Sequence, residues 1–281
     1  MYDSIIIGLG PAGIQAAIYL KRFNFNVLLI GAKDSNLCYA KSIDNYYGVL
    51  PVGGKELFEI GLKQATDLNI DIKEEMVLGI ENQGTFVVKT KENEYEGKTV
   101  FIATGAAKAK LPGINFQKYE SNGLSYCAIC DSFFYRNKNI ALIGTSDYMA
   151  SELEVLQRIT DKITIFTNGK PLEVETKFPV VTDKIKEFYG QDYLEGIKTD
   201  KEYNFDGVFV AVGSASSFDF AKHLGLLLDE KNKIIVNDVN MTNVVGIYAG
   251  GDNTGEPLQI AKAVYDGMTV AFAIKEQLKE E

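Results

Sequence analysis

The segment with the clearest capacity for chemistry is YCAICD at residues 126–131, in which two residues separate Cys127 from Cys130. That spacing brings two sulfurs close enough for a small strained disulfide, and a helix that begins there would stabilise the thiolate of the first cysteine. Asp131 follows directly and can give and take the proton that dithiol exchange requires, although an acid in a solvated loop is the plainer interpretation. The segment therefore predicts a redox-active disulfide.

Two other interpretations of the cysteine pair stay open. A structural zinc needs four ligands, and beyond the pair the chain offers only Cys38 and its single histidine, His223. The second alternative is a pair of buried thiols that carry out no reaction. Three cysteines in 281 residues cannot build a disulfide framework. We therefore predict a catalytic disulfide and no metal site.

A second motif, GLGPAG at residues 8–13, stands between an apolar run and the amphipathic segment IQAAIYLKR. In a strand, turn and helix of this kind, Gly8 allows the sharp bend, Gly10 lets the backbone approach a pyrophosphate, and Gly13 lets helix and strand pack closely. The start of the helix offers unpaired N–H groups to the anion. We predict a dinucleotide site here, with a glycine-rich turn of no function as the alternative.

The second strand of this βαβ unit, expected at residues 25–30, lacks the acid that commonly follows it. A carboxylate about 20 residues after the glycines usually holds the ribose hydroxyls. Here that position is Gly31, and Asp34 is the nearest acid. Ribose recognition therefore falls to Asp34 or to the backbone.

A second βαβ pattern begins after residue 139, but its turn reads GTSDYM at 144–149. Ser146 stands where a pyrophosphate needs bare backbone, and Met149 stands where helix and strand should touch. Side-chain atoms would crowd the phosphates, and Asp147 would repel them at close range. This half of the chain is predicted to keep the fold and to lose the ligand.

Apolar patterning locates the other elements. Strands are expected at 86–89, 99–103, 163–166 and 205–212, and helices at 148–158, 182–188 and 258–278.

Length and composition limit the classes of protein. At roughly 150 residues per domain, 281 residues make about two domains. No apolar run reaches the roughly 18 residues that span a bilayer, and a net charge of −9 without a long basic block argues against nucleic acid. The start MYDSIII carries an acid where a secretory signal carries basic residues, so we expect a first strand and a cytoplasmic protein.

Together the motifs resemble those of the low-molecular-weight thioredoxin reductases over nearly the whole chain. The matching pieces are GLGPAG at 8–13, Asn45 in DNYYG, ATG at 103–105, CAICDSFFYRN at 127–137, VAVG at 210–213, and AGGD with Gln259 near the end. The resemblance implies an α/β protein of two Rossmann-like, three-layer ββα domains. Residues 1–113 and 242–281 would form a discontinuous FAD-binding domain. Residues 114–241 would form an inserted redox-disulfide domain with a shortened, degenerate pyridine-nucleotide-type fold.

The resemblance also implies roles for individual residues. Cys130 would face the flavin, Cys127 would attack thioredoxin, and Asp131 would be the acid/base. The residues expected to hold FAD are Gly8, Gly10, Pro11, Ala12, Gly13, Asn45, Val77, Thr104, Gly105, Gly251, Asp252, Gln259 and Ile260. Asp252 would bond a ribitol hydroxyl, and Val77 would touch the adenine through its backbone. A homodimer is implied as well.

One departure from the family concerns the electron donor. The family ends the second strand of its nucleotide domain in a His-Arg-Arg cluster for the 2′-phosphate of NADPH, where this chain has Phe166-Thr167-Asn168-Gly169. Losing an arginine clamp removes charge-assisted bonds worth roughly 1.5–3 kcal/mol each. We therefore expect a thioredoxin reductase similar to the ferredoxin-dependent flavin enzymes, with ferredoxin or flavodoxin as its donor and thioredoxin as its acceptor.

Two competing functions remain. One is an NAD(P)H-dependent thioredoxin or peroxiredoxin reductase that tolerates Ser146 in the second turn. The other is a non-catalytic flavoprotein that senses redox state through its cysteine pair.

Overall fold

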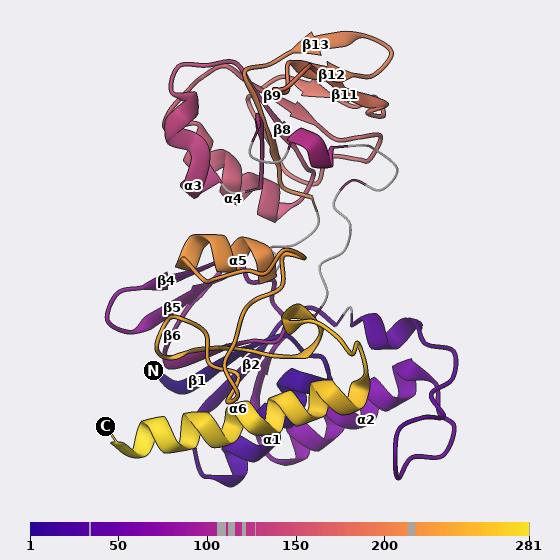
Figure 1. Ribbon diagram of the computed structural model, residues 1–281, viewed down its shortest axis with the longest axis vertical. Helices are drawn as coiled ribbons and strands as arrows, with labels where there is room; N and C mark the ends of the chain where they lie inside the picture. Colours follow the sequence, from indigo (N-terminus) through magenta and orange to yellow (C-terminus); the bar gives the residue numbers. More distant parts are fainter. Residues whose placement is uncertain are drawn as a thin grey trace. The chain divides into compact units, whose positions relative to one another are not determined.

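The computed structural model describes residues 1–33, 35–105, 111, 116–119, 122–126, 128–212 and 217–280. The chain divides into two compact units, drawn in Figure 1 and treated separately below. Unit 1 comprises Met1–Ala107 and Ser216–Glu281, and unit 2 comprises Lys108–Ala215.

Unit 1 is built on a seven-stranded sheet in the order β3-β2-β1-β6-β5-β4, with β15 also paired to β6. Its strands are β1 (Tyr2–Ile7), β2 (Val27–Ile30), β3 (Asp71–Lys73), β4 (Gly79–Asn82), β5 (Phe86–Lys89), β6 (Glu94–Ile102) and β15 (Ile247–Ala249). The first half of β6 pairs antiparallel with β5, and its second half pairs in parallel with β1 and β15. The continuous apolar runs of β1 and β2 follow from this position, because parallel strands are buried on both faces.

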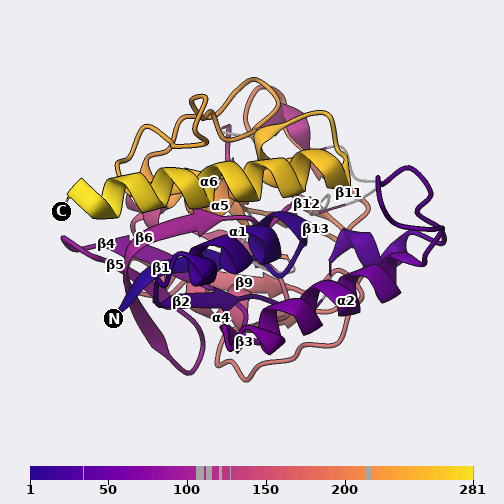
Figure 2. The same cartoon turned by 90° about the horizontal axis from the view of Figure 1, so that it is seen from below.

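Three helices pack together in unit 1: α1 (Pro11–Arg22), α2 (Gly54–Asp67) and α6 (Ile260–Glu280). They lie side by side along the sheet, with α1 between the other two (Figure 2). Pro11 opens α1, where a missing N–H costs nothing, and Lys21 and Arg22 stand in the last turn, where positive charge favours the helix end. The core joins α1 to β2 and α6 through residues such as Leu20, Leu29 and Ile274.

Short elements complete unit 1. They are η1 (Asn36–Tyr39), α5 (Ser217–Leu224) and η4 (Gly251–Thr254).

Unit 2 holds a parallel sheet in the order β10-β9-β8-β14-β7 and a small antiparallel sheet in the order β11-β12-β13. The strands are β7 (Leu124–Ser125), β8 (Ile140–Ile143), β9 (Ile163–Phe166), β10 (Val180–Val181), β11 (Glu187–Tyr189), β12 (Gly196–Lys198), β13 (Glu202–Asn204) and β14 (Gly207–Val210). The helical elements are η2 (Gln117–Tyr119), α3 (Ala128–Asp131), η3 (Ser132–Tyr135) and α4 (Asp147–Leu156). Two Rossmann-like parallel sheets confirm the α/β fold class expected from the sequence.

The helix expected at 182–188 is wrong. Val180–Val181 forms β10, and Glu187–Tyr189 forms β11, which pairs with β12. Ile185 and Phe188 are both buried, a spacing of three that also suits a helix face, so the local pattern could not separate the two outcomes. The antiparallel pairing with β12, the next strand along the chain, decides in favour of the strand.

The second crossing between the units lies at residues 215/216, whereas the expected domain limits placed it at 241/242. The reason lies in the segment that ends near Met241. The backbone N–H of Ile234 donates to Asn253 O at 2.9 Å, and Lys233 Nζ donates to Asp252 O at 2.8 Å. The buried Asn240 side chain donates to Ala249 O at 3.0 Å. These bonds attach the segment to unit 1.

The crossing of α1 and α6 allows a test of close packing. A Cβ atom at Gly267 would lie 2.2 Å from Ala12 O, a backbone atom of α1 that cannot move aside. We expect Gly267→Ala to lower the free energy of unfolding by about 1–3 kcal/mol, because overpacking outweighs the roughly 1 kcal/mol that alanine gains in a helix. Urea unfolding of the purified protein measures this change.

Gly61→Ala in α2 is the matched control. A Cβ atom there would meet only the end of the Ile14 side chain, at 3.2 Å, which can adjust. Its urea midpoint should stay level or rise. Equal midpoints for the two variants would contradict the packing argument.

Candidate functional site

The glycine turn after β1 is shaped by contacts that exclude side chains. A Cβ atom at Gly8, where φ is +126°, would lie 2.2 Å from Ala103 O. One at Gly13 would lie 2.0 Å from Gly8 O. Gly10 differs, because its Cβ would approach only Ser35 Oγ, at 3.7 Å. Two of the glycines thus fix the turn, and the third leaves bare backbone beside open space.

The start of α1 completes this turn as a place for an anion. Gly10 is the residue before the helix, and no side chain caps the N–H groups of the first turn. Pro11 and Ala12 follow without charge. Uncapped N–H groups at the start of a 12-residue helix, next to bare backbone, are what a pyrophosphate needs.

The end of β6 lies against the same turn, as the contact of Gly8 with Ala103 shows. Thr104 follows, and its hydroxyl Oγ1 is buried with no hydrogen-bond partner among the described residues. Gly105 has a φ of +75° and open space where a side chain would stand. A buried hydroxyl without a partner beside open backbone fits a site for a polar ligand.

The turn η4 approaches α1 from the other end of the chain. Gly251 has a φ of +79°, and a Cβ atom there would lie 3.4 Å from the Cβ of Ala12. Asp252 follows it. The structure therefore brings together predicted residues of segments 8–13, 103–105 and 251–252, which are far apart in sequence.

A second pairing joins Asn45 to the start of α6. Asn45 Nδ2 donates to Gln259 Oε1 at 3.2 Å, and Ile260 is the first residue of the helix. Val77 is buried in the connection between β3 and β4, and its contact with adenine stays a prediction.

The absence of an acid after β2 has a physical cause. A Cβ atom at Gly31 would lie 3.3 Å from Gly8 Cα, tighter than an ordinary contact, so a carboxylate there would crowd the glycine turn. Asp34, the other candidate for the ribose, lies outside the described residues. Geometry thus explains why this position is glycine.

The corresponding turn of unit 2 is filled. A Cβ atom at Gly144 would lie 2.6 Å from Met149 Cβ and 2.3 Å from Ala211 O. Met149 and its neighbour Tyr148 are fully buried within α4. Thr145 O accepts a hydrogen bond from the backbone N–H of Glu173 at 2.9 Å, so a later segment also lies against the turn. The contact of Gly144 with Ala211 repeats that of Gly8 with Ala103, whereas Ser146 replaces the open Gly10 and Met149 replaces the closely packed Gly13.

The residues that directly end β9, Phe166-Thr167-Asn168-Gly169, include no basic residue, although Lys170 follows them in the loop. Asn168 Oδ1 accepts a hydrogen bond from Ile185 N at 2.9 Å and so serves the backbone. A lysine nevertheless reaches this corner from the next segment, because the Lys184 stem lies 2.7 Å from a Cβ built at Gly169. Alignment of the loop alone missed that side chain.

The redox motif is described in part. Cys127 and the Cys130 side chain lie outside the described residues, whereas the backbone of α3 is described from Ala128. Ser125 Oγ donates to Asp131 Oδ2 at 2.6 Å. Burial raises the pKa of the Tyr135 phenol, and the Asp131 carboxylate raises it further, so this tyrosine stays neutral beside the acid.

Sequence reasoning missed two residues on α4 that hold the backbone around the motif. The carboxylate of Glu152, only 4% exposed, accepts a hydrogen bond from Ala128 N at 2.6 Å. Tyr148 OH donates to Tyr126 O at 3.5 Å. The two side chains are four residues apart and therefore share one face of α4. The burial of Glu152 is the feature of the structure that marks this contact.

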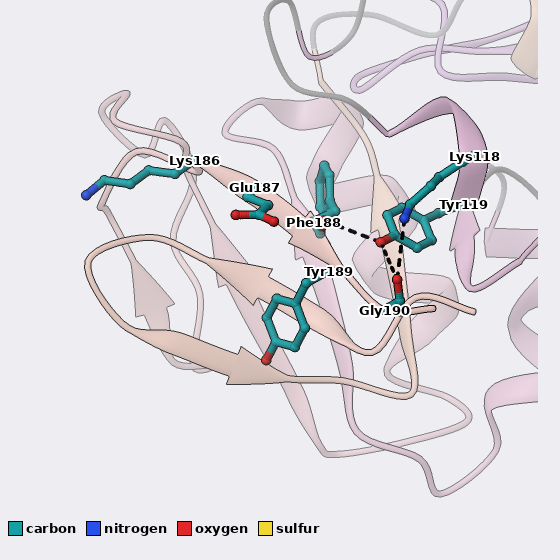
Figure 3. Close-up of a pocket in the computed structure, with 7 residues that line it drawn as sticks. All are labelled: Lys118, Tyr119, Lys186, Glu187, Phe188, Tyr189 and Gly190. Carbon is teal, nitrogen blue, oxygen red and sulfur yellow. Dashed lines mark hydrogen bonds between the residues drawn. The ribbon is translucent and has the colours of Figure 1, made fainter. Parts of the chain in front are cut away.

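Unit 2 also holds a cavity of about 390 Å³ between η2 and β11 (Figure 3). It is lined by Lys118, Tyr119, Lys186, Glu187, Phe188, Tyr189 and Gly190. Tyr119 lies in the wall of the cavity, and its OH donates a hydrogen bond to Gly190 O at 3.0 Å. None of the predicted site residues lines this cavity.

The described residues contain neither a cluster of metal ligands nor a membrane-spanning helix. No group of three or more His, Cys, Asp or Glu residues there could hold a metal ion. No helix in that part of the chain is long and apolar enough to cross a membrane. Cys38 is half-buried against the core of unit 1.

Known proteins share this arrangement. The chain matches the family model of the pyridine nucleotide-disulphide oxidoreductases over residues 2–172 and 179–267. It is 31% identical to a thioredoxin reductase of Ureaplasma parvum over 301 residues, 99% of this chain and 97% of the relative. It is 30% identical to a thioredoxin reductase of Bacillus subtilis, over 100% and 96%.

Solved structures give the same result. The atypical thioredoxin reductase TRi from Desulfovibrio vulgaris Hildenborough has a TM-score of 0.92 at 32% identity, over 100% of this chain and 99% of that one. A ferredoxin-flavin thioredoxin reductase from Clostridium acetobutylicum has a TM-score of 0.77 at 31% identity, with the same coverage.

Fold and glycine turn thus define a pyridine nucleotide-disulphide oxidoreductase. Within that class the chain belongs to the low-molecular-weight thioredoxin reductase family, and it is a thioredoxin reductase-like flavoprotein. The resemblance drawn from the sequence motifs is confirmed.

The contact between Glu152 and Ala128 generates a prediction. Glu152→Ala should lower the stability of unit 2 by about 1.5–3 kcal/mol, because it removes a hydrogen bond to a charged group and leaves a buried N–H without its acceptor. Hydrogen exchange at the Ala128 amide measures the loss. Glu154→Ala, two residues along the same helix and exposed, is the control. Equal protection in both variants would show that the contact stabilises nothing.

Proposed function

We propose that the protein transfers electrons from reduced ferredoxin through FAD and a Cys127–Cys130 disulfide to thioredoxin. The observation that supports this most strongly is the filled turn of unit 2. A pyridine nucleotide needs bare backbone for its pyrophosphate, and in this turn Ser146 stands at the position of Gly10 while the backbone of Glu173 is bonded to Thr145 O. Electrons must then come from another macromolecule.

The residues of unit 1 fit FAD. The Gly10 backbone and the uncapped start of α1 suit the pyrophosphate, and the Thr104 hydroxyl, which has no partner within the described part of the chain, has a donor to offer. Asp252 would take a ribitol hydroxyl, and α6 would direct its N-terminus at the flavin pyrimidine carbonyl. Bound FAD supplies chemistry that can accept electrons singly and deliver two to a disulfide.

Each residue of the redox motif has a proposed step. The Cys127 thiolate attacks the thioredoxin disulfide, which forms a mixed disulfide and releases one thioredoxin thiolate. The Cys130 thiolate then attacks Cys127 sulfur, which restores the enzyme disulfide and releases the second thioredoxin thiolate. Asp131, held by Ser125 at 2.6 Å, moves the protons that these thiolates exchange.

Partner and location follow as further parts of the proposal. The ferredoxin-flavin enzyme with which this fold aligns supports a protein donor, with flavodoxin as the alternative to ferredoxin. The exposed Phe133 and Phe134, at 72% and 68%, follow the redox motif and suit a protein partner. We also propose a cytoplasmic homodimer that binds neither nucleic acid nor membranes.

One observation favours an NAD(P)H-dependent thioredoxin or peroxiredoxin reductase. Lys184 lies over Gly169, close to the loop where the family places its phosphate-binding cations. A single lysine offers a point charge rather than a bidentate clamp, so it supports weaker binding than an arginine pair. A redox sensor without catalysis is the remaining alternative, and it predicts no thioredoxin-coupled turnover.

The electron donor can be identified by anaerobic titration of the yellow protein. Reduced ferredoxin should bleach the flavin absorbance within seconds, whereas NADH or NADPH at about 1 mM should leave it unchanged, because at that concentration only a site with a Kd near or below 1 mM would fill. Rapid bleaching by either nucleotide would refute ferredoxin dependence. Lys184→Ala would then show whether that lysine holds the phosphate.

Asp131 can be tested apart from electron entry. Asp131→Asn keeps the shape and removes the proton carrier, so thioredoxin reduction should slow by roughly 10²–10⁴-fold. Flavin reduction by ferredoxin should stay at the wild-type rate. Asp161→Asn, an exposed acid of the same unit, is the control. Equal thioredoxin rates for both variants would remove Asp131 from the proton path.

A further inference from the structure

The turn η4 is fastened by a lysine of α6 whose donors are all used. Lys262 Nζ donates to Gly251 O at 2.7 Å and to Thr254 Oγ1 at 2.8 Å, and it pairs with Asp266 Oδ2 at 2.9 Å. An ammonium group has three N–H donors, and each has one acceptor here. The side chain is 18% exposed. It is therefore a fixed part of the structure rather than a mobile surface charge.

Asp266, the acid of this ion pair, binds the other backbone polar group of Gly251. Asp266 Oδ2, on a side chain only 6% exposed, accepts a hydrogen bond from Gly251 N at 2.8 Å. The N–H and the carbonyl of Gly251 are thus bound by opposite members of one ion pair. Together these contacts hold a residue whose φ of +79° only glycine adopts readily.

Stability alone does not account for this pair. Two charges removed from water are costly, and apolar residues of similar size often serve a fold equally well. The exposed pair Lys63–Asp67 on α2 has the same spacing of four residues and a similar separation of 2.8 Å, yet it binds no turn. What distinguishes Lys262 and Asp266 is their grip on the peptide that precedes Asp252.

We propose that Lys262 and Asp266 are positioning residues for bound FAD, which act by fixing the direction in which Asp252 presents its carboxylate. The inference rests on the proposed FAD site. Gly251 also contacts Ala12 at the start of α1, so the same pair sets the distance between η4 and the pyrophosphate turn. FAD affinity should then depend on an ion pair that itself touches no part of the cofactor.

The test is a titration of the apoprotein, freed of flavin, with FAD, followed by quenching of flavin fluorescence and by the visible flavin spectrum. Lys262→Met should raise the Kd for FAD at least tenfold and blur the vibrational structure of the visible absorption band of the oxidised flavin. Lys63→Met removes the exposed pair and should leave both readouts unchanged.

A double variant separates positioning from folding. Lys262→Met leaves Asp266 as an unpaired buried charge, and Lys262→Met with Asp266→Asn relieves it, so the melting temperature of the apoprotein should recover. The Kd for FAD should stay raised, because neither group then grips Gly251 as before. Recovery of affinity together with stability would show that the pair only supports the fold, and would overturn the inference.

The outcomes for the wild type and the variants are distinguishable. A wild-type apoprotein that fails to bind FAD would refute the proposed function itself. A wild type that binds FAD, with a Lys262→Met variant of equal affinity, would refute the positioning role alone.

Discussion

A dinucleotide can bind at a strand, turn and helix only where the backbone of the turn is bare. The turn of unit 1 meets this requirement, and the corresponding turn of unit 2 does not. In unit 1, contacts force glycine at Gly8 and Gly13 and leave Gly10 open, with uncapped N–H groups at the start of α1. In unit 2, Ser146 stands at the position of the open glycine, Met149 stands at the helix–strand contact, and the backbone of Glu173 is bonded to the turn. One fold thus occurs twice, once with a bare glycine turn and once without.

The loss in unit 2 accompanies a different use of the same helix. Tyr148 and Met149 are buried in its first turn, and Glu152 follows one turn later. Tyr148 and Glu152 bind the backbone on either side of Cys127, at Tyr126 and Ala128. A helix that would otherwise face a nucleotide therefore supports the segment for which we propose the redox disulfide. In unit 1 a single helix likewise has two roles, because α6 packs on α1 and also holds η4 through Lys262 and Asp266.

Much of this could be predicted from the sequence, because the decisive signals are local. Strand, glycine turn and helix follow one another directly at residues 2–22, and the crowding of the second turn could be predicted from Ser146 and Met149 alone. The contacts that sequence reasoning missed are those between distant segments. Lys184 reaches the loop at Gly169 from another segment, and the grip of Lys262 on Gly251 depends on how a loop folds back on its helix. The strand at 187–189 was missed for another reason, because its buried residues have a spacing that suits a helix as well, and only its pairing with β12 decides.

Direct binding of the nucleotide is the closest test of the blocked turn, and isothermal titration calorimetry of the oxidised flavin-loaded protein with NADPH and NADH measures it without relying on turnover. A turn that carries Ser146 in place of the open glycine and is bonded to the backbone of Glu173 predicts no saturable heat up to about 1 mM of either nucleotide, which bounds any Kd above that value. Saturable one-to-one binding of either nucleotide below that concentration would contradict the claim, because it would show that the chain still offers the nucleotide a site.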